Sequence, residues 1–391
     1  MFSLDNFYYV LHANFLQPFR MVDAWFSTFN FDSFDDLIID YYSKKDPTKC
    51  NSMVIFYDQE PLIPAIFNDI MYHPRTFSSL ARANTRRILA NSEISDLKTQ
   101  VCRELGLYDW YYFFHGLAAL EWYRDFKYVP RIDNQFTKVF ITFNHLVTKD
   151  RSYRLNLIAS ILEKGLDHHG LISCQLGDNN GTWRDEILSP SSKLSVEAKK
   201  RIYMQFSKLK DPYILDVHDD SYNMCSARLN IPLQQQALWH LVTETVFYYD
   251  KLHLTEKVFQ PIVARRPFML VGGQGNLAYL KRYGFKTFDC WVDESYDNEV
   301  DPDLRIKKIV AELDRLSKMS VGELNTMYAE MQDTLDFNFN HFYGEFKSIV
   351  ISEMIGNFEK CLKQLNVGAF PENVLDVKKF DARAVYTRLL Q

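Results

Sequence analysis

Short apolar runs alternate with longer amphipathic segments along most of this 391-residue chain. A short apolar run that ends abruptly in polar residues is typical of a buried strand, whereas apolar side chains spaced by 3.6 residues mark a helix. Alternating strands and helices predict an α/β fold with mainly parallel sheets. The predicted strands lie at 53–57, at the start of 87–93, and at 111–116, 139–144, 171–177, 212–217, 237–242 and 267–273.

These elements form two successive series, separated by a polar, proline-led stretch from Pro130 to Gln135. We therefore predict a first α/β domain over residues 1–132 and a second over residues 133–345. Residues 346–391 are predicted to form a C-terminal helix and tail. A chain of this length suits two domains.

The stretch from Ala237 to Gly273 gathers polar residues where predicted strand, loop and helix join. Glu244 follows the apolar run that ends at Val242. Thr255 has the chemistry of a helix N-cap, because its side-chain oxygen can accept from the first free backbone N–H groups. An ordinary capped helix is one interpretation of this stretch.

Glu256 and Lys257 occupy the first turn after that cap. Free N–H groups and the helix dipole favour an anion such as a phosphate there. A carboxylate can accept from two adjacent sugar hydroxyls, and a lysine supplies a point charge for phosphate. The pair therefore indicates a site for a nucleotide diphosphate.

Glu244-Thr245, the run from Leu254 to Ile262 (LTEKVFQPI) and the run from Pro267 to Gly272 (PFMLVG) together resemble the donor-binding segment of the fucosyltransferases. The resemblance covers roughly 35 residues. It implies a glycosyltransferase of the GT-B type, with two Rossmann-like domains facing a cleft and a C-terminal helix crossing back to the first domain. The first domain would be the acceptor side, and the second would bind the nucleotide-sugar.

The same resemblance implies that Glu256 binds the nucleotide ribose and Lys257 the diphosphate. It also implies a nucleotide-sugar as co-substrate, with no cofactor and no metal. Two departures stand out: Thr245 and Val246 replace Asn-Ser after Glu244, and Arg265-Arg266 stands where that family carries small residues. The identity of base and sugar therefore does not carry over.

Further donor-binding candidates lie at strand ends and helix starts of the second domain. Arg151 and Arg154 lie near a helix start, where the dipole disfavours cations, so either a donor phosphate or the neighbouring Asp150 offsets them. The complete predicted donor set is Asn144, Arg151, Arg154, Glu244, Thr255, Glu256, Lys257, Gly272 and Gly273.

Gly273 to Ala278 matches G-x-G-x-x-A, with Asp293 twenty residues beyond Gly273. A dinucleotide-dependent oxidoreductase is therefore a lesser alternative. Too few strands follow to build a dinucleotide-binding domain downstream. The same glycines would let a sugar-nucleotide approach the backbone closely.

Candidate catalytic residues lie in the first domain. Asp58 and Glu60 follow the strand 53–57, and open α/β sheets place ligand groups at such ends. We prefer Glu60 as the base for an acceptor hydroxyl, with Asp58 and His115 as further candidates. A turn closed by Pro61 and a purely structural His115 are the alternatives.

A basic window follows, because no acid occurs between Asp69 and Glu93. Such a one-sign patch can seat an anionic acceptor, although a solvated helix face has the same pattern. The patch comprises Arg75, Arg82, Arg86 and Arg87.

Composition narrows the class of protein. Hydrophobic residues make up 47% and charged residues 24%, as in ordinary globular proteins. There is no run of about 18 apolar residues and no evident signal peptide. Six scattered cysteines suit a reducing compartment, so we expect a cytoplasmic protein. The net charge of −5 argues against broad adhesion to nucleic acid or anionic membrane, but permits a local patch.

We therefore expect a hexosyl- or pentosyltransferase that moves a sugar from a nucleotide-sugar to a hydroxyl. The acceptor is either a glycan or a hydroxymethylated DNA base, as in the base-glucosylating enzymes of bacteriophages. A non-catalytic nucleotide- or sugar-binding module is the alternative. Asp216, Asp219 and Asp220 form the nearest approach to a metal motif, and the oligomeric state stays open.

Overall fold

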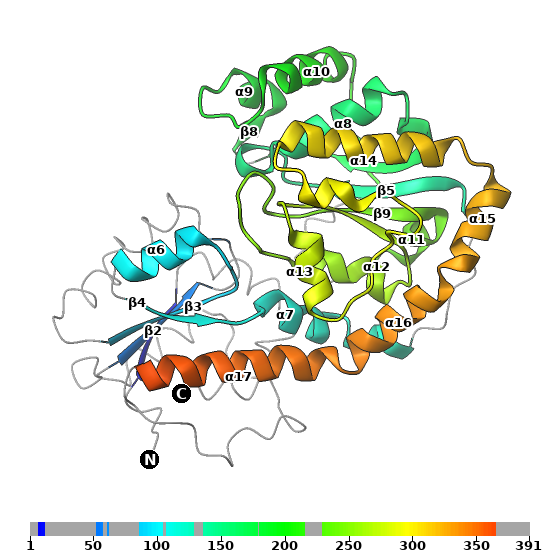
Figure 1. The fold of residues 1–391 in the computed structure, drawn as a ribbon. Coiled ribbons are helices and arrows are strands. Elements are labelled where there is room, and N and C mark those ends of the chain that lie inside the picture. The colour runs from blue at the N-terminus through cyan, green and yellow to red at the C-terminus, as the bar shows by residue number, and fades with distance from the viewer. Residues whose placement is uncertain are drawn as a thin grey trace, which may run out of the picture. The chain divides into compact units, whose positions relative to one another are not determined.

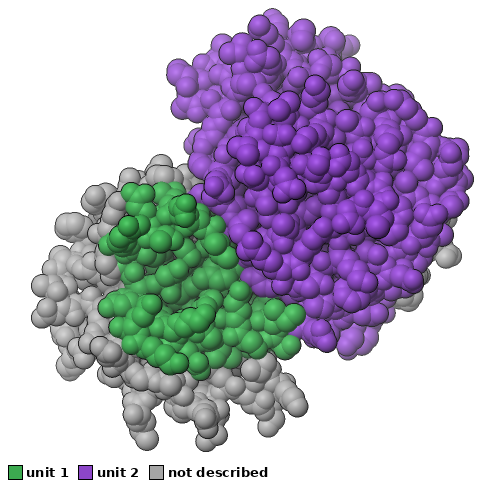
Figure 2. Space-filling model, viewed as in Figure 1, with its two compact units in different colours: residues 1–118, 220–225, 347–391 green, residues 119–219, 226–346 purple. Residues whose placement is uncertain are grey.

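The computed structural model describes residues 7–11, 52–57, 61, 86–104, 107–128, 136–178, 180–215 and 229–364 (Figure 1). The chain divides into two compact units, coloured separately in Figure 2. Unit 1 contains residues 1–118, 220–225 and 347–391. Unit 2 contains residues 119–219 and 226–346. Each unit contains a four-stranded parallel sheet, so the α/β prediction is confirmed.

The sheet of unit 1 has the strand order β1-β2-β3-β4, all parallel. Its strands are Phe7–Leu11 (β1), Ser52–Tyr57 (β2), Arg86–Asn91 (β3) and Leu107–Tyr111 (β4). Helix α6 (Asp96–Glu104) lies between β3 and β4 in sequence and begins after Ser95, whose Oγ accepts from the backbone N–H of Lys98 at 3.1 Å. This is the capping chemistry expected of a serine at a helix start.

Helix α17 (Phe346–Gln364) packs on β4 through residues of unit 1. Trp110 donates its ring N–H to the carbonyl of Met354 at 3.1 Å, and its ring lies 4.2 Å from that of Phe358. Asn357 donates to the carbonyl of Tyr111 at 3.0 Å. The predicted domain boundaries at 132 and 345 stay predictions.

The sheet of unit 2 has the order β10-β9-β5-β6, also all parallel. Its strands are Lys138–Asn144 (β5), Gly170–Cys174 (β6), Ala237–Thr243 (β9) and Phe268–Val271 (β10). From β5 the chain adds β6 on one side and later returns to add β9 on the other. The strand order therefore reverses between β5 and β9, and ligands of open parallel sheets bind at the carboxyl ends beside such a point.

The principal helices of unit 2 pack around this sheet (Figure 1). They are α8 (Tyr153–Glu163), α9 (Trp183–Leu188), α10 (Val196–Phe206), α11 (Ile231–Gln236), α12 (Phe259–Val263), α13 (Asn276–Arg282), α14 (Pro302–Ser317), α15 (Val321–Glu330) and α16 (Gln332–Tyr343). Short 3-10 turns occupy Arg124–Tyr128, Lys149–Arg151, Asp167–His169, Glu256–Val258 and Glu294–Asn298. A two-stranded hairpin joins Gly177–Asp178 (β7) to Gly181–Thr182 (β8).

Local sequence explains why these elements form where they do. Every residue of β9 is buried, and its sequence is largely apolar, as expected for a strand of a parallel sheet that is covered on both faces. Asp301 caps α14 by accepting from Asp303 and Leu304, and Pro302 takes the first helical position. No helix in the part of the chain that the structure describes is long and apolar enough to cross a membrane.

Two sequence predictions of strands are corrected. The run 111–116 is not one strand: β4 ends at Tyr111, and helix α7 (Phe114–Trp122) begins three residues later. A fully buried apolar run has no periodicity that separates helix from strand. The predicted strand 212–217 is reduced, within the described residues, to an isolated bridge between Tyr213 and Cys174.

His240 gives the fold a testable pH dependence. Burial in β9 lowers the pKa of its imidazole from 6.5 to about 3. Because the unfolded chain then binds the proton more readily, the stability contributed by neutral His240 is present above pH 6.5 and is lost as the pH falls. Relative to His240→Asn, the wild-type free energy of unfolding should fall by up to about 1.4 kcal/mol per pH unit below 6.5. Urea unfolding from pH 7 to pH 5 measures this, and parallel profiles would contradict it.

Candidate active site

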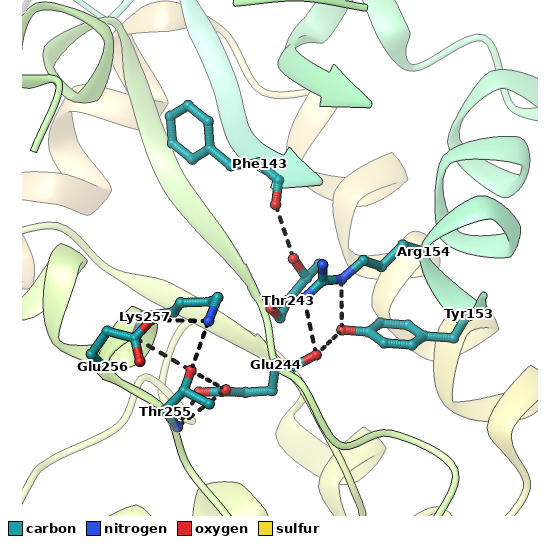
Figure 3. Close-up of polar contacts among 8 residues, drawn as sticks. All are labelled: Phe143, Tyr153, Arg154, Thr243, Glu244, Thr255, Glu256 and Lys257. Atoms are coloured by element: carbon teal, nitrogen blue, oxygen red, sulfur yellow. Dashed lines mark hydrogen bonds and ion pairs between the residues drawn. The ribbon is translucent and has the colours of Figure 1, made fainter. Parts of the chain in front are cut away.

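Polar groups converge where the strand order of unit 2 reverses, as Figure 3 shows. Thr243 ends β9, and its hydroxyl donates to the carbonyl of Phe143 in β5 at 3.1 Å. Asn144 ends β5 and is fully buried, and its amide donates to Thr142 and to the carbonyl of Ser173 at 3.2 Å each. The predicted site residue Asn144 therefore ties β5 to β6.

Glu244 is the first residue beyond β9, and its side chain closes the loop that follows. Both carboxylate oxygens accept from the backbone N–H of Thr255 at 3.2 Å, and one also accepts from the Thr255 hydroxyl (Figure 3). Glu244 is completely buried. Burial raises the pKa of its carboxyl, while Lys257 and the hydrogen bonds from Thr255 act in the opposite direction.

Thr255 caps the turn that carries Glu256 and Lys257, as predicted from the sequence. Its hydroxyl oxygen accepts from the backbone N–H of Lys257 at 3.4 Å. The element that follows is a three-residue 3-10 turn and then α12, rather than one long helix. Few peptide dipoles are aligned in such a short element, so the preference of this turn for an anion rests mainly on Lys257.

The side chains of Glu256 and Lys257 contact each other (Figure 3). The Lys257 ammonium lies 3.0 Å from Glu256 Oε1 and 3.3 Å from the Thr255 hydroxyl. Glu256 is almost buried, whereas the Lys257 side chain keeps 32% of its surface exposed. The turn therefore presents a positive charge to solvent beside an oriented carboxylate.

Tyr153 and Arg154, at the start of α8, donate hydrogen bonds to main-chain carbonyls at the strand ends. The Tyr153 hydroxyl donates to the carbonyls of Glu244 and Val271. Arg154 donates to the carbonyl of Leu146 at 2.8 Å and to those of Thr243 and Glu244 at 2.9 and 3.2 Å. These two side chains connect the ends of β5, β9 and β10.

This arrangement gives Arg154 a structural role that the sequence did not indicate, and its role as a donor ligand stays a prediction. Arg154 is buried, and its guanidinium is used by main-chain carbonyls. Those carbonyls also offset the cation that the sequence places at a helix start. Arg151 lies half-buried in the 3-10 turn before α8, and its role as a donor ligand stays a prediction.

Arg305 holds the opposite side of the loop and was not predicted. From α14 it donates to the carbonyls of Phe247 and Gly272 at 2.9 and 3.0 Å, and to that of Glu299 at 2.7 Å. Phe247 stacks on Tyr153 with ring centroids 4.1 Å apart. The available sequence signal was an arginine beside the inward position Ile306 of an amphipathic helix, since a buried charge needs a partner.

Gly273 packs closely against the protein's own loop, and its role as a donor ligand stays a prediction. A Cβ there would lie 2.9 Å from the side-chain nitrogen of Asn276 and 3.2 Å from the carbonyl of Tyr249. Asn276 donates to the carbonyl of Lys251 at 2.8 Å and accepts from the backbone N–H of His253 at 2.9 Å. The side of Gly273 on which a side chain would stand is thus filled by the protein's own loop.

The neighbouring glycines serve the backbone. A Cβ on Gly272 would meet Glu244 in ordinary contact at 3.5 Å, and Gly275 caps α13 with a left-handed φ of 76°. Within the described residues no strand follows β10, so the glycine-rich match does not open a dinucleotide-binding sheet.

The outer part of the loop is held by a second polar cluster. The Tyr249 hydroxyl donates to Asp150 at 2.6 Å. The Lys193 ammonium lies 3.4 Å from Asp150 and 3.5 Å from the centre of the Tyr249 ring. Burial, together with Asp150, raises the pKa of the Tyr249 phenol, which therefore stays protonated at neutral pH.

The predicted catalytic and acceptor residues belong largely to other parts of the chain. His115 lies in the first turn of α7 in unit 1, is buried, and meets the Phe114 ring edge-on at 5.3 Å. Asp58, Glu60, Arg75, Arg82, Asp216, Asp219 and Asp220 lie outside the described residues, as do the side chains of Arg86 and Arg87 in β3.

Across the part of the chain that the structure describes, no three His, Cys, Asp or Glu side chains gather as a metal site. No protein-family model matches the chain, and no curated protein matches its sequence. Among solved structures, a UDP-forming alpha, alpha-trehalose-phosphate synthase from Burkholderia xenovorans is similar at 10% identity and a TM-score of 0.40. The match covers 90% of this chain and 74% of that one. A likeness this distant establishes neither a shared family nor a shared activity.

The Glu244–Thr255 contact predicts a measurable difference between two substitutions. Thr255→Val keeps the branched shape but removes the hydroxyl that caps the turn and donates to a buried carboxylate. We expect a loss of about 1–3 kcal/mol in unfolding free energy, because Glu244 loses a hydrogen-bond partner. Thr255→Ser keeps the hydroxyl and should retain most of that stability. Equal stability of the two variants in urea unfolding would show that the hydroxyl contributes little.

Proposed function

We propose that this protein is a glycosyltransferase that holds a nucleotide-sugar donor at the carboxyl edge of β5 and β9. The observation that supports this most directly is the Thr255-Glu256-Lys257 turn, tied by Glu244 to the end of β9 where the strand order reverses. Open parallel sheets bind ligands at that place. The sequence of this segment also resembles the donor-binding segment of the fucosyltransferases.

Within this proposal Glu256 and Lys257 bind different parts of the donor. The partly exposed Lys257 ammonium contacts the diphosphate, and the Glu256 carboxylate accepts from the ribose hydroxyls. Their contact at 3.0 Å holds the two side chains in neighbouring positions before a ligand arrives. Such preorganisation reduces the side-chain entropy that binding must remove.

The reaction would be a displacement at the anomeric carbon. The acceptor oxygen forms a bond to that carbon, the bond to the diphosphate oxygen breaks, and the nucleoside diphosphate leaves with the electron pair. Lys257 offsets the charge that grows on the departing diphosphate. In an inverting transfer the acceptor proton passes to a base, for which Glu60 remains our first proposal, with Asp58 second. His115 is the third candidate, because its imidazole is buried and an acceptor hydroxyl could reach it less easily.

Two acceptor classes fit the proposal: a hydroxyl of a glycan and the hydroxyl of a hydroxymethylated DNA base. A non-catalytic module of the same fold would bind the donor without turnover. Release of nucleoside diphosphate from a panel of sugar nucleotides separates an enzyme from such a module. A thermal-shift screen of the same panel finds the donor, since a ligand at a hundred times its Kd stabilises a protein by about 2.7 kcal/mol.

Activity is predicted to survive removal of metal ions. In the proposal the charge of Lys257 takes the place of a bound cation at the diphosphate. Donor turnover in excess EDTA should therefore stay within about twofold of the untreated rate. Loss of a group that stabilises charge in the transition state would lower the rate by about a hundredfold or more. Complete loss in EDTA, restored by Mg²⁺ or Mn²⁺, would contradict this and direct attention to Asp216, Asp219 and Asp220.

Substitutions in the central turn should separate its two roles. Lys257→Ala removes a charge from a group that becomes more negative as the sugar leaves, so both kcat and donor affinity should fall. Glu256→Ala removes contacts to a part of the donor that does not change in the reaction, so mainly the donor KM should rise. Each loss should be about ten- to a hundredfold, since charge-assisted hydrogen bonds contribute about 1.5–3 kcal/mol.

Lys318→Ala is a matched control, because Lys318 pairs with Asp314 at 2.8 Å beyond the far end of α14. It should leave kcat and KM unchanged. Thermal unfolding of all three variants checks that the fold is retained. Normal donor binding and turnover in both central variants would show that the turn is structural.

A further inference from the structure

Helix α10 exposes three large apolar side chains to solvent. It packs on α8 and α9 through its inward face, where Ala198, Ile202 and Phe206 are buried. On the outward face, Val196, Tyr203 and Met204 keep 62%, 61% and 51% of their surface exposed. These positions are seven and eight residues apart and so lie on one side of the helix. Large apolar residues grouped on one exposed face mark an interaction surface.

The same surface is basic, although the whole chain carries a net charge of −5. Residues 183–210 contain seven Lys and Arg against three Asp and Glu, a local net charge of +4. Lys200 lies between Val196 and Tyr203 on the outward face, and Lys208 and Lys210 follow the end of α10. All three are exposed and form no ion pair with another described residue. Glu197 is also exposed on α10, so the three apolar side chains lie among lysines that outnumber this one acid.

We propose that the outward face of α10, with Lys200, Lys208 and Lys210, docks on an anionic lipid surface. Apolar side chains between lysines suit the boundary between lipid headgroups and acyl chains. A tyrosine also suits this boundary, because its ring can contact the acyl chains while its hydroxyl stays among the headgroups. A nucleic acid would use the lysines but gain little from Val196 and Met204. A second copy of the same face would bring two surfaces of charge +4 together, which is repulsive.

The docking surface is firmly joined to the loop after β5. Glu186 of α9 is buried and accepts from the backbone N–H of Lys149 at 2.8 Å. Lys193, between α9 and α10, reaches Asp150 in the same 3-10 turn. Figure 1 shows α9 and α10 together at one edge of unit 2. The lipid contact stands independently of the proposed transferase activity, because it involves neither Glu256 nor Lys257.

Co-sedimentation of the full chain with lipid vesicles tests the proposal. The protein should bind vesicles that contain phosphatidylserine in phosphatidylcholine and should not bind phosphatidylcholine alone. Each lysine near an anionic surface strengthens binding by about fivefold, so K200Q/K208Q/K210Q should weaken it by roughly a hundredfold. High salt should have a similar effect. Absence of binding to the anionic vesicles overturns the proposal.

The apolar residues provide the decisive comparison. Y203S/M204S keeps every charge, and it should weaken vesicle binding at least about tenfold because the buried apolar area is lost. L304S/V321S is the matched control, since Leu304 and Val321 are also exposed but lie on α14 and α15. Vesicle binding that persists in Y203S/M204S, or falls equally in the control, overturns the assignment to α10. Concentration-dependent dimerisation lost in Y203S/M204S, or DNA binding without vesicle binding, overturns it in favour of those partners.

Discussion

The hydrogen bonds between the buried carboxylate of Glu244 and Thr255 are the interaction on which the geometry of the candidate site in unit 2 depends. A carboxylate taken out of water is costly unless hydrogen bonds replace its hydration, and here Thr255 supplies them through its N–H and its hydroxyl. Thr255 can do so only if the chain returns to the end of β9 after an eleven-residue excursion. The hydrogen bonds that compensate the burial of Glu244 therefore fix the position of the turn that carries Glu256 and Lys257.

Two buried arginines satisfy a second requirement of the same region. Parallel strands place the carbonyls of their last residues at one edge, and these carbonyls need donors when they are buried. Arg154 and Arg305 provide them, bonding in the described structure to oxygens without formal charge. Asp297, Glu299 and Asp301 act electrostatically on Arg305, and Glu256 pairs with Lys257 at 3.0 Å, so acidic groups of the same region balance these cations. The two arginines therefore act here as donors that satisfy buried carbonyls at the strand ends.

The sequence predicted the elements whose signal is local. Apolar runs located β5 and β9, and the chemistry of Thr255 located the cap. Contacts between residues that are distant in sequence could not be predicted in this way. From the sequence, either a donor phosphate or the neighbouring Asp150 was expected to offset Arg154, whereas the structure brings the carbonyl of Thr243 to it from 89 residues away. Gly273 was predicted to let a sugar-nucleotide approach the backbone closely, and the loop that packs against it is identifiable only in the folded chain.

The loop between Glu244 and Thr255 shows why such distant contacts matter for function. Long loops are usually mobile, and ordering one on ligand binding reduces affinity. Here separate partners hold the loop along its length: Arg305 at Phe247, Asp150 at Tyr249 and Asn276 at His253. Because these hydrogen bonds already order the loop, the position of the turn that carries Glu256 and Lys257 does not depend on a ligand. Within that turn, the contact of the two side chains at 3.0 Å orients them relative to each other.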